Sequence, residues 1–133
     1  MSQENVNVVL AQHDAIERQD FGAAEALHTN DVTLVVDPGV APDSGVFVGV
    51  EAAKWYGRWF HTFADDYRFE IIEVVDAGGS VVVVARHRGT GRTSGAAVEM
   101  VSASAFWIRG GLIWRVELYR DKAQALEAAG LSE

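Results

Sequence analysis

The chain has 133 residues, which is a usual size for one compact domain, and 49% of them are hydrophobic, enough to form a core. Its 11 basic and 19 acidic residues give a net charge of -8 at pH 7, and a field of this sign disfavours nucleic acid and anionic membranes as partners. Cysteine is absent, which excludes disulfides, thiol nucleophiles and thiolate metal sites.

The N-terminal sequence MSQENVNVVL lacks the basic segment and apolar stretch of a secretory signal. No apolar run approaches the roughly 20 residues that a membrane-spanning helix requires. We therefore expect a cytoplasmic protein that does not enter a membrane.

Apolar spacing predicts three helices in the first half of the chain. The first spans 5–18, where apolar positions recur at three- and four-residue steps. Asp20 is placed to cap the second, because its carboxylate accepts hydrogen bonds from free backbone N–H groups. Gly49 opens the third helix, which carries five aromatic residues. These are Trp55, Tyr56, Trp59, Phe60 and Phe63. A short C-terminal helix is expected over 122–129.

Runs of β-branched residues predict a short strand pair followed by four long strands. The strands are 32–36, 46–48, 67–76, 80–88, 98–108 and 112–119. Gly78-Gly79 and Gly110-Gly111 join two pairs of long strands, since glycine adopts the positive φ angles of tight hairpin turns. The long strands therefore form an antiparallel meander.

These elements predict an α+β fold with one domain over residues 1–133. We expect a cone-shaped, strongly curved, mostly antiparallel sheet, with three N-terminal helices packed on its concave face and a short C-terminal helix. A sheet bent this strongly does not fill its own hollow, which predicts a pocket for a small molecule. The convex face is expected to be free for a homodimer contact.

Three phrases resemble the SnoaL-like branch of the nuclear transport factor 2-like superfamily. They are ERQDFGAAEAL at 17–27, GVFVGVEAA at 45–53 and FWIRGGLIWRVELYRDKAQALEAAGL at 106–131. Their order and spacing extend the resemblance over nearly the whole chain. It implies the cone fold and kinship with ketosteroid isomerases, polyketide cyclases, limonene epoxide hydrolase and scytalone dehydratase, whose chemistries differ on a shared fold.

Asp37 ends a predicted strand and precedes Pro38, where the mouth of the pocket is expected. The stretch resembles that of ketosteroid isomerases, whose general base is an aspartate of an Asp-Pro pair after the equivalent strand. The resemblance implies that Asp37 moves a proton next to a carbonyl group. Asp-Pro-Gly is also an ordinary turn composition, so a role as a turn cap stays open.

His87 is the second candidate catalytic residue. Side chains alternate along a strand, so Arg86 and Arg88 share one face and His87 lies on the other. Unpaired arginines are costly to bury, so their face should be the wetter, convex one, leaving His87 to point inward. There a neutral imidazole relays a proton or orients a carboxylate, as the resemblance to scytalone dehydratase implies, or is a hydrogen-bonded interior residue.

Two further positions differ from the isomerase pattern. Ser104 falls where ketosteroid isomerase has a protonated aspartate, and either Gln12 or His13 falls near its oxyanion-hole tyrosine. We expect Ser104 and His13 to hold a developing oxyanion, although a serine is a weaker donor than the acid. Alternatively, Ser102 and Ser104 leave room for a ligand, and His13 is a buried, hydrogen-bonded residue.

The remaining lining residues are expected to be apolar. The predicted set is Ile16, Trp55, Trp59, Phe63, Phe106, Val116 and Leu118. Leu118 stands where limonene epoxide hydrolase needs a carboxylate, which disfavours water activation between two acids. Arg115, Glu117 and Tyr119, on the opposite face of the last strand, are expected at a convex dimer contact.

The four histidines lack the spacing of paired metal ligands, so we expect no metal, and no motif predicts a cofactor. One hypothesis is a cofactor-free cyclase, isomerase or dehydratase acting on an apolar, carbonyl-bearing molecule. A second is a non-catalytic module that binds a hydrophobic ligand. A third is a dimerisation scaffold whose pocket is filled by aromatic side chains.

Overall fold

The computed structural model describes residues 2–131, which form one six-stranded sheet and four helices. In chain order the elements are α1 (Ser2–Glu17), α2 (Phe21–Glu25), β1 (His28–Val36), β2 (Gly45–Val48), α3 (Val50–His61), β3 (Arg68–Asp76), β4 (Ser80–Thr90), β5 (Ala97–Arg109), β6 (Leu112–Tyr119) and α4 (Lys122–Ala128). Within the described residues, no helix has both the length and the apolar character needed to cross a membrane.

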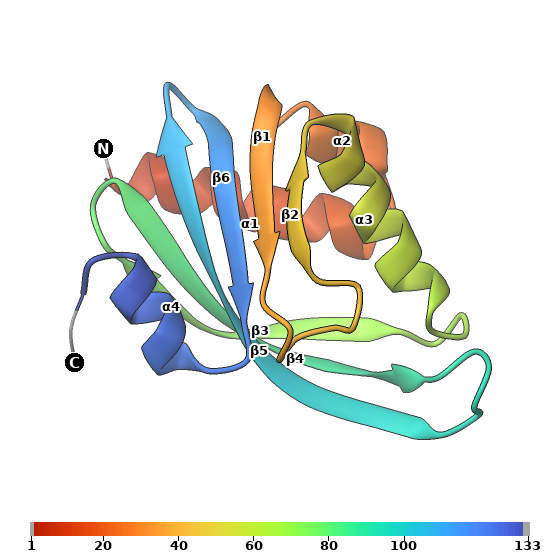
Figure 1. Ribbon diagram of the computed structural model, residues 1–133. Helices are drawn as coiled ribbons and strands as arrows, with labels where there is room; N and C mark the ends of the chain where they lie inside the picture. The colour runs from red at the N-terminus through yellow and green to blue at the C-terminus, as the bar shows by residue number, and fades with distance from the viewer. Residues whose placement is uncertain (1, 132–133) are drawn as a thin grey trace.

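The strands lie in the order β2-β1-β6-β5-β4-β3, and the sheet curls so that β3, β4 and β5 sweep away from β1 and β2 (Figure 1). Only the β1–β6 contact among these pairs is parallel. The register shifts within β1, β3 and β5. Such irregularities bend a strand and increase its twist, which curls the sheet. The predicted α+β cone with a mostly antiparallel sheet is confirmed.

The element boundaries follow the local signals closely. Asp20 accepts a hydrogen bond from the backbone N–H of Ala23, and Asp121 caps α4 in the same way. Gly49 precedes α3 with φ of 61°, a conformation that a residue with a Cβ rarely adopts. β1 begins at His28, earlier than the predicted start at 32, because pairing with Ile113 of β6 extends the ladder beyond the apolar run.

The main core lies between the concave face of the sheet and the helices α1 and α3, and Ala24 of α2 packs in a smaller cluster with Ala15 and Ile16 of α1. Val9 of α1, Trp55 of α3 and Phe106 of β5 meet there with Leu34 and Val116 of the neighbouring strands β1 and β6. α1 crosses behind the strands in Figure 1. The burial of these large side chains holds the helices against the curved sheet.

The convex face differs from expectation, because α4 covers part of it. α4 lies in front of the sheet in Figure 1, on the side opposite α1. Leu126 of α4 belongs to a second core cluster with Val82 and Val84 of β4 and Ala103 and Ala105 of β5. These strands are apolar on both faces, so each face requires a helical cover. A homodimer through the rest of this face stays a prediction.

Candidate functional site

A cavity of about 60 Å³ lies between the concave side of β3 to β6 and the helices α1 and α3. Its lining includes many of the residues expected from the sequence. They are Gln12, His13, Ile16, Trp55, Trp59, His87, Ser102, Ser104, Phe106 and Leu118. Tyr67 also lines it. We call this space the sheet cavity.

Four of its side chains form one hydrogen-bonded row. Trp59 Nε1 donates to the Tyr67 hydroxyl oxygen at 2.9 Å. The same hydroxyl lies 2.6 Å from His87 Nδ1, and His87 Nε2 lies 2.7 Å from Ser102 Oγ. Helix α3, the residue just before β3, and the strands β4 and β5 thus contribute to the row, which runs along one wall of the sheet cavity.

The row has two hydrogen-bonding arrangements, because a neutral imidazole carries one N–H. In the first, Tyr67 O–H donates to His87 Nδ1, and His87 Nε2–H donates to Ser102. In the second, Ser102 O–H donates to His87 Nε2, and His87 Nδ1–H donates to Tyr67. The hydroxyl that does not donate to the histidine is free to donate into the cavity: Ser102 in the first arrangement and Tyr67 in the second.

Burial keeps every member of this row uncharged at neutral pH. Desolvation lowers the pKa of His87 to about 4, with a smaller contribution from nearby His13. Desolvation also raises the pKa of the Tyr67 hydroxyl. Both effects disfavour the charged form of a group removed from water. The row is therefore suited to moving protons without building up a buried charge.

His13 presents an acceptor to the same cavity. Its Nδ1 lies 2.9 Å from the carbonyl oxygen of Val9, which can only accept, so Nδ1 carries the proton and Nε2 has a free lone pair. The ring stacks on Phe69 at 5.8 Å and meets the edge of Phe106 at 5.2 Å. Burial lowers the pKa of His13. A neutral imidazole in this orientation can accept a hydrogen bond from a donor group.

Gln12 is only 1% exposed and is held by polar contacts at the end of the cavity. Its side chain forms a hydrogen bond with Tyr56, and its Nε2 lies 3.4 Å from His28 Nε2. His28 Nδ1 donates to the Ala24 carbonyl at 2.7 Å, so its Nε2 accepts from the Gln12 amide. Ser104 lies beside Ser102 on the same face of β5 and lines the cavity as well.

Three residues expected at the site lie outside the lining of the sheet cavity. The Asp37 carboxylate accepts a hydrogen bond from the Gly39 N–H at 2.9 Å, which is the geometry of a turn cap. Phe63 stacks on Tyr67 at 4.5 Å and supports it. Val116 faces a different cavity.

Tyr67 is a polar residue of the cavity lining that the sequence reasoning missed. It stands immediately before β3, and its hydroxyl reaches His87 because Phe69 pairs with His87 across β3 and β4. A sequence signal existed: an aromatic residue with a hydroxyl lies two positions from Phe69, on the alternation that faces inward. Predicting the contact between Tyr67 and His87 also required the register of β3 on β4. The Gly78-Gly79 turn alone does not fix that register.

Burial of the histidines predicts that acid destabilises the fold. The unfolded chain binds a proton at each histidine near pH 6.5, whereas His87 in the folded chain resists protonation to about pH 4. Between these values the unfolded state binds more protons, so stability falls as the pH falls, by at most about 1.4 kcal/mol per pH unit for each such histidine. Thermal unfolding at pH 7, 6 and 5 measures this loss.

Two histidine variants separate the contribution of His87 from the effect of acid on the rest of the chain. His87→Gln should lose less stability between pH 7 and 5 than the unchanged chain. His61→Gln removes an exposed imidazole of α3 and should keep the original pH dependence. Equal pH dependence of all three proteins would contradict the assignment of His87 as a buried neutral group.

No group of three or more histidine, aspartate or glutamate side chains within residues 2–131 is arranged to hold a metal ion. The polar groups of the sheet cavity are instead hydroxyls, imidazoles and an amide. Such groups can donate and accept hydrogen bonds.

The sequence pattern of the SnoaL-like domain matches residues 9–116. A nuclear transport factor 2-like protein from Burkholderia thailandensis E264 is 26% identical, over 90% of this chain and 95% of that one, with a TM-score of 0.76. A candidate SnoaL-like polyketide cyclase from Jannaschia sp. CCS1 is 19% identical, over 96% and 91%, with a TM-score of 0.78. Comparison with curated proteins found no match.

A third similar structure is a nuclear transport factor 2-like protein of unknown function from Burkholderia pseudomallei K96243. It is 21% identical, over 93% of this chain and 95% of that chain, with a TM-score of 0.77. At this level of identity the likeness concerns the fold, and the arrangement of side chains in the cavity has to supply the argument about chemistry.

Proposed function

Because this chain belongs to the SnoaL-like domain family, we propose that it binds an apolar, carbonyl-bearing small molecule and shifts a proton on it without a cofactor. The reaction class is that of a cyclase, isomerase or dehydratase. The observation that carries the proposal is the row Trp59–Tyr67–His87–Ser102, hydrogen-bonded at 2.9, 2.6 and 2.7 Å along the wall of the sheet cavity.

The apolar walls select the ligand. Trp55, Phe106 and Leu118 line the cavity and favour a compact apolar group over polar metabolites. The hydroxyls of Ser102 and Ser104 are donors for a carbonyl oxygen, on which negative charge develops when the neighbouring carbon loses a proton. Binding therefore orients the carbonyl group toward β5.

The proton step uses the first arrangement of the row and ends in the second. The carbon beside the carbonyl gives its proton to the Tyr67 oxygen as Tyr67 gives its own to His87 Nδ1. His87 Nε2 passes its proton to Ser102, and Ser102 protonates the carbonyl oxygen. The product is the enol, and no residue gains or loses net charge. Trp59 holds the Tyr67 oxygen in place throughout.

This step is common to the reactions named. An enol can be reprotonated at another carbon, attack a second carbonyl to close a ring, or expel a leaving group, so the same row serves isomerisation, cyclisation and dehydration.

Exchange of carbon-bound hydrogen with solvent tests the proposal without knowledge of the natural substrate. Small ketones and 1,3-diketones, incubated with the protein in D₂O, should lose the proton NMR signal of the carbon beside the carbonyl about 10²-fold faster than in buffer alone. Ketones that bind, as shown by a raised melting temperature, but exchange at the buffer rate would overturn the catalytic proposal.

A specific observation favours a second candidate, a binding module without catalysis. No aspartate or glutamate is among the described residues that line the sheet cavity, since the Asp37 carboxylate is bonded within its turn. Burial lowers the pKa of His87 to about 4, so it is a weak base by itself. This candidate predicts ligand-induced stabilisation with no exchange, which is the outcome that distinguishes it from the first.

A further inference from the structure

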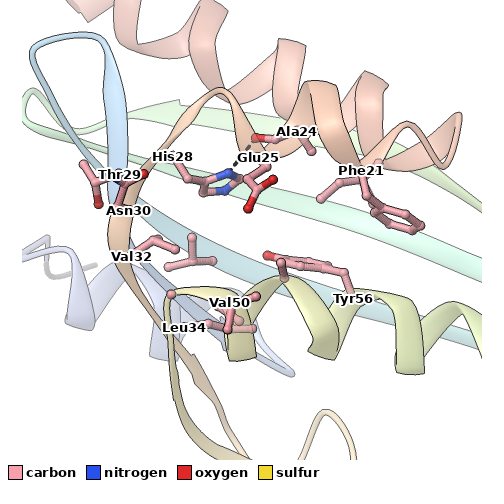
Figure 2. Close-up of a pocket in the computed structure, with 15 residues that line it drawn as sticks. Phe21, Ala24, Glu25, His28, Thr29, Asn30, Val32, Leu34, Val50 and Tyr56 are labelled. Carbon is pink, nitrogen blue, oxygen red and sulfur yellow. Dashed lines mark hydrogen bonds between the residues drawn. The ribbon is translucent and has the colours of Figure 1, made fainter.

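A second cavity, of about 160 Å³, lies between α2, the start of β1 and the first turns of α3 (Figure 2). We call it the helix cavity. Ile16 and Tyr56 line both cavities and form the partition between them. Phe21, Val32 and Leu34 supply much of its apolar wall. An apolar cavity of about 150 Å³ is large enough to bind benzene, so this one can hold a ring or a compact alkyl group.

Glu25 supplies the carboxylate among the described residues that line the helix cavity. Figure 2 shows the Glu25 carboxylate and the His28 ring side by side, reaching toward Val50 and Tyr56 on the opposite wall. His28 Nδ1 donates to the Ala24 carbonyl at 2.7 Å and its Nε2 accepts from the Gln12 amide at 3.4 Å, so both ring nitrogens already have partners. Burial lowers the pKa of His28 and outweighs the nearby charge of Glu25, which raises it. The imidazole is therefore neutral and the carboxylate carries the local charge.

One hydroxyl of this wall also lacks a partner. Thr29 Oγ1 is buried and makes no hydrogen bond with any described residue. A buried polar atom without a partner costs free energy, which a ligand or water that bonds it would recover. Thr29 lies beside His28 at the same end of the cavity.

The charge of the residues that line the helix cavity favours a positively charged ligand. No lysine or arginine is among the described residues that form it, and Glu25 supplies a carboxylate. The chain as a whole carries a net charge of -8, which repels anions and attracts cations. The rings of Phe21 and Tyr56 add faces that attract a cation.

We propose that the helix cavity is a second binding site, for a small organic cation: a protonated amine joined to an apolar ring or alkyl group. The apolar part occupies the space between Phe21, Leu34 and Tyr56, and the ammonium group donates to the Glu25 carboxylate at the rim. This site is independent of the proton row, which lies beyond the partition and needs no cation.

Three ligands of one shape and different charge test the proposal: benzylammonium, benzyl alcohol and benzoate. Titration of the ¹⁵N-labelled protein, followed by amide chemical shifts, should show benzylammonium binding with shifts at residues 21–34 and 49–56. Benzyl alcohol should bind at least about fivefold more weakly, and benzoate more weakly still, because each loses the attraction to Glu25.

Variants locate the charge that is responsible. Glu25→Gln should weaken benzylammonium binding about fivefold and leave benzyl alcohol binding unchanged. Glu127→Gln makes the same change on the exposed side of α4 and should leave both unchanged. Binding of benzoate as tight as that of benzylammonium, shifts confined to the sheet cavity, or no shifts at all would each overturn the proposal. None of these outcomes bears on ketone exchange, so the two proposals fail separately.

Discussion

Replacing His87 by glutamine is expected to slow ketone exchange about 10²-fold, to near the rate in buffer alone. The glutamine side chain can hydrogen bond to Tyr67 and Ser102, which lie 2.6 and 2.7 Å from the imidazole nitrogens. It cannot accept a proton at one atom while releasing one from another, which the imidazole does when it changes tautomer. The initial exchange rate, measured by proton NMR at saturating ketone, checks this result.

Two control variants make the result specific. His61→Gln alters an exposed histidine of α3 and should keep the original exchange rate. Asp37→Asn should also keep it, because the amide oxygen of asparagine can still accept from Gly39 and the carboxylate is outside the cavity lining. A loss in Asp37→Asn with full activity in His87→Gln would reverse the assignment and return the role of base to Asp37.

Replacing Phe106 by alanine is expected to lower the free energy of unfolding by about 3–5 kcal/mol. Phe106 is 2% exposed and belongs to the core cluster that joins the sheet to α1 and α3. Its ring also meets the edge of the His13 ring at 5.2 Å. Truncation removes this contact and leaves a void, because the curved sheet cannot close over it. Equilibrium unfolding in urea measures the change.

Val101→Ala on the same strand is the control for this prediction. Val101 is 41% exposed, so its truncation should change the free energy of unfolding by only about 0.5 kcal/mol. If both variants lost the same free energy, Phe106 would not be a centre of the core. If Phe106→Ala left the free energy of unfolding nearly unchanged, contacts other than those of Phe106 would have to hold the helices against the sheet.

The inward position of His87 could be predicted because it depends on local physics. The arginines at 86 and 88 seek water, and their ion pairs with Glu70 and Glu99 lie on the other face of the sheet. Alternation along β4 then directs His87 to the cavity. The order of the helices and strands followed for the same reason, since helical and strand spacing and the glycine pairs act over a few residues.

The orientation of Asp37 shows the limit of such reasoning. The resemblance to ketosteroid isomerase predicted a catalytic carboxylate, and the turn composition predicted a cap; both are compatible with the same five letters, VVDPG. The hydrogen bond from Gly39 is the contact that the folded chain makes. The Gly39 N–H is two residues from Asp37, so this hydrogen bond forms without closing a long loop. A contact between Asp37 and the sheet cavity would require distant segments to pack in one particular way.

Local patterns in the chain were enough to predict the helices and strands, their order, the net negative charge and the side chains on the concave face of the sheet, because these depend on composition and on neighbours a few positions apart. The tertiary structure alone decided that Trp59, Tyr67, His87 and Ser102 touch, since that contact needs the register of β3 on β4 and the position of α3 across them. It also decided that α2 and α3 leave a space lined by Glu25 and His28. Both depend on how distant segments pack, and a shift of one residue in register would direct these side chains to the opposite face of the sheet.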